Sequence, residues 1–74
     1  MKRSVTADGR KFEYILIRSR RRDVLLKALP GGETRVYAPG WAHIRDVDEL
    51  VRSRAGELRR MHEELEFALA RNRL

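Results

Sequence analysis

The sequence predicts an α+β fold in which an antiparallel β-meander of three to four strands is followed by one long C-terminal helix. Two observations support this prediction. In the first half of the chain, short runs of aromatic and β-branched residues are separated by turns that contain Gly or Pro, as in consecutive antiparallel strands. In the second half, apolar residues recur at spacings of three, four and seven, which is the period of an amphipathic helix. The 74 residues suit a single small domain.

Turn residues set the boundaries of the predicted strands. Asp8 and Gly9 favour a two-residue type I′ hairpin turn, because both central positions of that turn need a positive φ. A polar arginine-rich stretch, a Pro-Gly-Gly-Glu turn at 30–33 and the Pro-Gly pair at 39–40 separate or end the later runs. We therefore expect strands at residues 3–7, 11–19, 23–29 and 34–38.

The helical pattern predicts one helix over residues 47–71. Asp46 precedes the pattern and Glu49 follows Asp46 by three residues, which is an Asp-headed form of the capping box. Trp41, just before this cap, is expected to fill the corner between sheet and helix. A helix of about 25 residues is about 38 Å long, whereas a seven-residue strand spans about 24 Å. The second half of the helix should therefore extend beyond the sheet.

The predicted central strand carries apolar residues on both faces, with Phe12, Tyr14 and Leu16 on one and Ile15 and Ile17 on the other. One helix can cover only one face of a sheet, so we expect another protein surface to cover the rest. On the helix, a narrow apolar stripe of the coiled-coil type should pack against a second chain. The predicted interface residues are Leu58, Met61, Leu65 and Ala68.

The charge is concentrated in the first part of the chain. The net charge is +6, and residues 1–45 hold eleven Lys and Arg against four Asp and Glu. Such a surface favours polyanions in general. A solvated turn and contact with an acidic protein surface are the alternative interpretations of the arginine cluster. Four to six phosphate contacts predict weak, sequence-independent binding of duplex DNA, with a log–log salt slope of about −4 to −5. The candidate polyanion-binding residues are Arg18, Arg20, Arg21, Arg22, Lys27 and Arg35.

No residue pattern predicts catalysis or metal binding by this chain. His62 begins a His-Glu-x-x-Glu segment, but the zinc protease helix needs a second His where Glu66 stands, and a third ligand is lacking. We expect an exposed polar helix face there, with i, i+4 pairing. No Cys is present, and no Ser has a His and a carboxylate placed to activate it. We therefore predict no enzyme activity, no cofactor and no tight zinc binding.

No apolar run is long enough to span a membrane and no signal peptide is recognisable, so we expect a cytoplasmic protein without membrane contact.

Three segments, in this order and spacing, resemble one known family. They are Tyr14-x-Leu16-x-Arg18-Ser19-x-Arg21-Arg22, Gly32-x-Thr34-x-Val36-x-Ala38-Pro39 and Val51-Arg52-Ser53-Arg54. They are similar to the amino-terminal part of the YgjP-like predicted zinc metallopeptidases, also described as metal-dependent hydrolases, over about residues 5–62. The His-Glu-x-x-His helix of that family lies downstream of the matched segment, so no catalytic or metal-binding residue transfers to this chain.

The resemblance implies a non-catalytic amino-terminal module of a larger protein. The module would frame the missing C-terminal catalytic part, which alone would hold zinc, and a sheet edge would help to hold an extended substrate. Two other functions stay open. One is a small basic module that binds nucleic acid or another polyanion, and the other is a homo-oligomerising domain whose helix pairs with a second copy.

Overall fold

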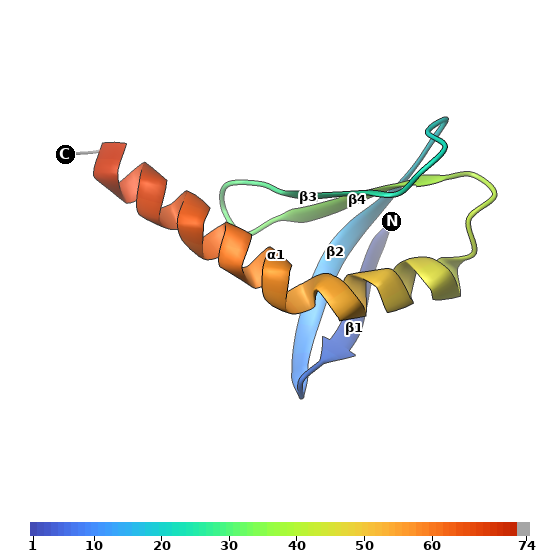
Figure 1. Cartoon of the computed structure of the whole chain (residues 1–74), viewed down its shortest axis with the longest axis horizontal. Helices are drawn as coiled ribbons and strands as arrows, with labels where there is room; N and C mark the ends of the chain where they lie inside the picture. The colour runs from blue at the N-terminus through green and yellow to red at the C-terminus, as the bar shows by residue number, and fades with distance from the viewer. Residues whose placement is uncertain (73–74) are drawn as a thin grey trace.

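A computed structural model describes residues 1–72 and shows a four-stranded sheet with one long helix packed across one face (Figure 1). The α+β prediction is therefore confirmed. The molecule measures 45 × 30 × 17 Å. Its elements are β1 (Lys2–Ala7), β2 (Arg10–Ser19), β3 (Leu25–Ala28), β4 (Thr34–Pro39) and α1 (Ile44–Asn72).

The sheet is mixed, so the prediction of an antiparallel meander is wrong. The strand order is β1-β2-β4-β3, with β2 and β4 parallel and both outer pairs antiparallel. The loop 20–24 carries the chain past the end of β4, which leaves β3 at the sheet edge and lets β4 return between β3 and β2. This loop is longer than a two-residue hairpin turn, so it does not force the strands on either side of it to pair.

Both sharp turns have the backbone that their residues favour. Asp8 and Gly9 have φ values of 53° and 74°, which confirms the expected turn between β1 and β2. Between β3 and β4, the amide N–H of Leu29 donates to the carbonyl of Glu33 at 2.8 Å.

The core lies between α1 and the sheet face toward it. Alternate residues of the strands and residues of α1 three or four apart form it, as the two periods require. Of the central strand, Phe12, Tyr14 and Leu16 are buried, whereas Ile15 and Ile17 stay half-buried on the opposite face. The other buried apolar residues are Val5, Ala7, Val36, Ala38, Val47, Val51, Ala55 and Leu58.

The helix begins three residues earlier than predicted. The amide groups of Asp46 and Val47 donate to the carbonyl of His43 at 3.0 and 3.1 Å, so Asp46 lies inside the first turn and does not cap it. Trp41 is 79% exposed and does not fill the corner between sheet and helix. The Arg18 guanidinium closes this corner instead, because it donates to the carbonyls that flank it, those of Pro39 at 2.9 Å and Ala42 at 2.7 Å.

Replacing Gly56 with Ala should raise the free energy of unfolding by about 0.5–1 kcal/mol, because Ala is the better helix former. Gly56 lies on the exposed side of α1, and a Cβ atom there meets no atom within 4 Å. Urea unfolding measures the difference. The matched control is Gly32→Ala in the β3–β4 turn, where a φ of +86° should make the same change destabilising. A loss of stability in Gly56→Ala would contradict a regular helix at this position.

Candidate functional site

The folded chain exposes more surface than its size requires. Its accessible surface is 5655 Å². A compact monomer of 8.7 kDa exposes about 4700 Å², so the excess is about 900 Å². The chain is therefore less compact than a typical monomer of its size, and the exposed apolar residues show which parts lie outside the core.

The last turns of α1 extend beyond the sheet, as the length comparison predicted (Figure 1). Phe67 is 66% exposed and Leu69 42%, although both are large and apolar. Of the predicted stripe, Leu58 is only 1% exposed and belongs to the core of the chain itself, so it is not an interface residue. Met61 is exposed, Leu65 is half-buried, and Ala68 is exposed. The uncovered part of the helix therefore begins one turn later than predicted.

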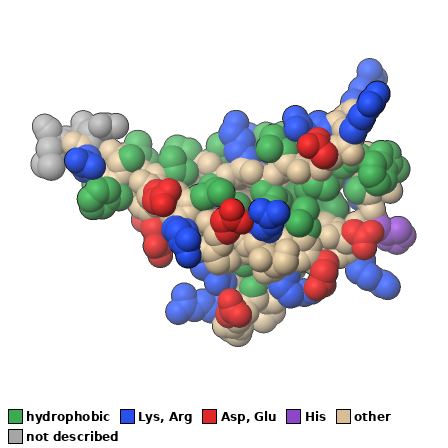
Figure 2. Space-filling model, viewed as in Figure 1, with side chains coloured by type: hydrophobic (Ala, Val, Ile, Leu, Met, Phe, Trp, Pro, Cys, Tyr) green, Lys and Arg blue, Asp and Glu red, His purple; other side chains and the backbone are tan. Residues whose placement is uncertain are grey.

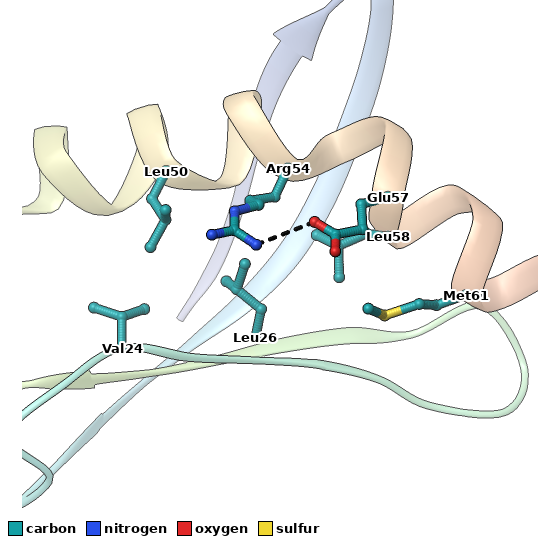
Figure 3. A pocket seen from close by; sticks show the side chains of 7 residues that line it. All are labelled: Val24, Leu26, Leu50, Arg54, Glu57, Leu58 and Met61. Carbon is teal, nitrogen blue, oxygen red and sulfur yellow. Dashed lines mark hydrogen bonds and ion pairs between the residues drawn. The ribbon is translucent and has the colours of Figure 1, made fainter.

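An apolar groove runs between the edge strand β3 and the helix, and we name it the β3–α1 groove. Its central hollow, of about 230 Å³, has Val24 and Leu26 on the strand side and Leu50, Leu58 and Met61 on the helix side (Figure 3). Figure 3 shows the Arg54–Glu57 ion pair on the same side of the helix, with a separation of 3.1 Å.

A second hollow, of about 390 Å³, continues the groove toward the end of the helix. It shares Leu26 and Met61 with the first hollow, adds the apolar residues Ala28 and Leu65, and has the charged residues Lys27 and Glu64 in its lining as well. The sequence pattern placed Met61 and Leu65 on one stripe but did not show that β3 forms the opposite wall.

The sheet face away from α1 carries a second uncovered apolar group. Tyr37 of β4 pairs with Ile17 of β2 on one side and with Leu25 of β3 on the other. Leu25 is 39% exposed, and the other two are half-buried. Lys27 and Arg35, from the predicted basic cluster, lie on this same face as direct cross-strand partners.

The structure divides the predicted basic cluster. Arg20, Arg21 and Arg22 are exposed together on the loop between β2 and β3, which projects from the body of the molecule (Figure 2). Arg18 is held by the two corner carbonyls described above, and Arg35 pairs with Glu33 at 3.0 Å. Three guanidiniums, one of them paired with Asp23 at 3.4 Å, therefore remain together for a polyanion.

A half-buried polar network, which sequence reasoning missed, joins the helix to the sheet. The Arg3 guanidinium donates to both oxygens of the Asp48 carboxylate, at 2.9 and 2.6 Å, and the Tyr14 hydroxyl donates to the same carboxylate. The hydrogen bonds from Arg3 hold the pKa of Asp48 below its usual range. Burial raises the pKa of Tyr14 to about 12, with a further contribution from its hydrogen bond to Asp48.

A signal for this network is present in the sequence. Asp48 precedes the buried residues Val51 and Ala55 at the three- and four-residue spacing of the buried stripe, and Arg3 lies on the same face of β1 as the buried Val5. A charged residue on each of two apolar faces indicates an ion pair between those faces. The network joins the first turns of α1 to β1 and β2 and so helps to fix how the helix lies on the sheet.

His62 faces the sheet, which corrects the expectation of an exposed polar helix face. Its Nε2 atom lies 2.7 Å from the hydroxyl oxygen of Thr34, a buried residue of β4. Within residues 1–72, no three side chains of the metal-binding types gather into a group that could hold a metal ion.

We expect no tight zinc binding by the isolated chain, because two or fewer ligands at one place do not hold zinc strongly. Calorimetric titration with zinc checks this, with His62→Ala as the matched variant. One zinc bound at sub-micromolar affinity by the parent chain, and lost in His62→Ala, would contradict the prediction.

Comparison with protein-family models, with curated proteins and with solved structures finds no match for this chain. Within residues 1–72, α1 lacks the long apolar stretch that a membrane-crossing helix needs.

Proposed function

We propose that the chain is a non-catalytic amino-terminal module that packs on the catalytic part of a zinc-dependent hydrolase of the YgjP-like kind. The main support for the proposal is the apolar surface on the part of α1 that extends beyond the sheet. A chain that folds around its own core yet exposes Phe67 and Leu69 at one helix end has a surface suited to a protein partner.

The module contributes position rather than chemistry. The end of α1 and the open sheet face bind the catalytic part, which supplies the zinc and its ligands. The segments that resemble the family form β2, β4 and the first half of α1, so they build the frame on which this surface stands. We place the protein in the cytoplasm, as the sequence predicts.

The test begins with the reading frame downstream of the codon for Leu74, where a His-Glu-x-x-His segment is expected. That segment is then expressed separately, and its complex with this chain is measured by mass and by hydrolysis of unfolded protein. Changing both Phe67 and Leu69 to Ser should weaken the complex, whereas Arg45→Ser, an exposed change at the other end of α1, should not.

Two results would overturn this function. One is a reading frame without the motif. The other is a chain whose mass doubles with concentration over about a hundredfold range and returns to that of a monomer in Leu65→Ala, because that result assigns the helix surface to a second copy.

The three exposed loop arginines support a second function, the binding of a polyanion. With three phosphate contacts, the log–log salt slope on duplex DNA should be about −2 to −3 rather than the −4 to −5 expected of the whole cluster. Fluorescence titration at several salt concentrations checks this. Arg20→Ala should reduce the slope by about one, and Arg18→Ala should leave it unchanged. Discrimination between DNA sequences at constant salt would contradict the prediction.

A further inference from the structure

The two edges of the sheet are protected to different degrees. Met1 and Leu16 exchange both backbone hydrogen bonds, at 2.7 and 2.8 Å, so alternate residues of β1 direct their polar groups toward β2 and the others direct theirs outward. Thr6 is one of the outward residues, and its carbonyl accepts a hydrogen bond from Arg52 of the helix at 3.1 Å. A side chain of α1 thus blocks the β1 edge, and the outward positions of β1 are polar.

The β3 edge is short and carries Lys27, but within residues 1–72 no side chain bonds to its outward backbone groups. The Leu29–Glu33 hydrogen bond and the register of β3 on β4 show that Leu25 and Lys27 direct their backbone groups toward β4. The N–H and C=O groups of Leu26 and Ala28 therefore point outward, and within residues 1–72 no backbone or side-chain group bonds to them. The side chains of Leu26 and Ala28 line the β3–α1 groove.

We propose that the β3 edge binds an extended peptide segment in which apolar and acidic residues alternate. Backbone groups of Leu26 and Ala28 bond the peptide as an added strand, and its apolar side chains enter the β3–α1 groove beside Leu26 and Met61. This inference goes beyond the proposed function, which uses the end of α1 and the open sheet face rather than the β3 edge.

The positive charge of Lys27 favours an acidic residue at one position of the peptide. Lys27 lies on the open sheet face directly opposite Arg35, and like charges opposite one another are unfavourable. Arg35 has Glu33 as a partner, whereas Lys27 has no ion-pair partner within the described residues. An added strand places one residue opposite Lys27 on that face, and a carboxylate there supplies the missing negative charge.

A second copy of the chain fits this edge less well. If β3 paired with itself about Lys27, two lysines would face each other. The alternative register, about Leu26, would place Leu25 opposite Lys27 and leave its charge without a partner. The net charge of +6 also favours an acidic partner over another copy.

The experiment uses the folded chain and the synthetic peptide acetyl-Thr-Leu-Glu-Leu-Glu-Leu-Thr-amide, titrated to about 1 mM and followed by NMR. Binding should slow hydrogen exchange of the Leu26 and Ala28 amides, while those of Leu25 and Lys27, already bonded to β4, change little. The same peptide with Lys in place of Glu should bind about two- to fivefold more weakly. The variant Lys27→Glu should reverse this preference.

Ala28→Pro removes one outward N–H that would bond the peptide, so it should abolish binding. The variant should still fold, because Pro is tolerated at an edge position whose N–H faces solvent. The amide spectrum of this variant must show the native sheet. If Ala28→Pro unfolds, the test rests on the Lys27→Glu variant alone, which should bind the Lys peptide more tightly than the Glu peptide.

Three results would overturn the inference: no binding to the folded chain, equal binding of acidic and basic peptides, or concentration-dependent protection of Leu26 and Ala28 without peptide, which would assign the edge to a second copy. None of these measurements uses the catalytic part. Failure of the peptide to bind therefore leaves the proposed function standing, and an unchanged complex in the Phe67 and Leu69 variant leaves this inference standing.

Discussion

Leu58→Ala should lower the free energy of unfolding by about 2–5 kcal/mol, because it removes a fully buried side chain and leaves a cavity between helix and sheet. Leu58 is the last residue of α1 that is fully buried in the core. For a domain of this size, such a loss is a large part of the total stability, so the variant should be partly unfolded at 37 °C. Urea unfolding followed by circular dichroism measures it.

Leu69→Ala is the matched control, because it makes the same chemical change eleven residues further along the same helix. At that position the side chain is half-exposed and the change should cost under about 0.5 kcal/mol in the isolated chain. Equal losses in both variants would contradict the boundary that we draw between the core and the free end of the helix.

Asp48→Ala should cost about 2–3 kcal/mol, because it removes charge-assisted hydrogen bonds and leaves the Arg3 guanidinium half-buried without its partner. Asp46→Ala, two residues earlier in the same turn, is the control. Asp46 is exposed, so its loss should cost under about 1 kcal/mol through the helix dipole alone. Similar losses for the two variants would mean that the network contributes little.

The same network gives the stability a pH dependence. The pKa of Asp48 is lower in the folded chain than in the unfolded one, so its contribution is complete above the unfolded pKa of about 4 and disappears as the pH falls further. The pKa of Tyr14 rises from 10.0 to about 12, so its contribution disappears as the pH rises through that interval. The difference in stability between the parent chain and Asp48→Ala should therefore be constant near pH 7 and shrink below pH 4.

Local patterns predicted every element of this fold. Asp8 and Gly9 determined a turn by their backbone preference, and the alternation in β2 determined which residues meet the helix. The pairing of β2 with β4 could not be predicted in this way, because parallel pairing joins residues about twenty positions apart and leaves no mark on the residues between them.

The candidate site was predicted in part for the same reason. Met61 and Leu65 follow from helical spacing alone, whereas the other wall of their groove comes from β3, whose place at the edge depends on the strand order. Arg18 looked like one more member of a basic cluster. Its guanidinium bonds to carbonyls more than twenty residues away, and only the folded corner brings them together.

The mixed sheet consists of two local hairpins, β1–β2 and β3–β4, that meet along one parallel junction. Each hairpin closes through a short turn and can form within microseconds, whereas the junction must wait until both exist. We expect docking of the two hairpins beneath α1 to be the slow step in folding. Val36→Ala, at the junction, should then slow folding. Val5→Ala, in the β1–β2 hairpin, affects a step that precedes docking. Stopped-flow measurements give, for each variant, the change in the folding barrier divided by the loss of stability. Equal ratios for the two variants would show that the sheet assembles in one step.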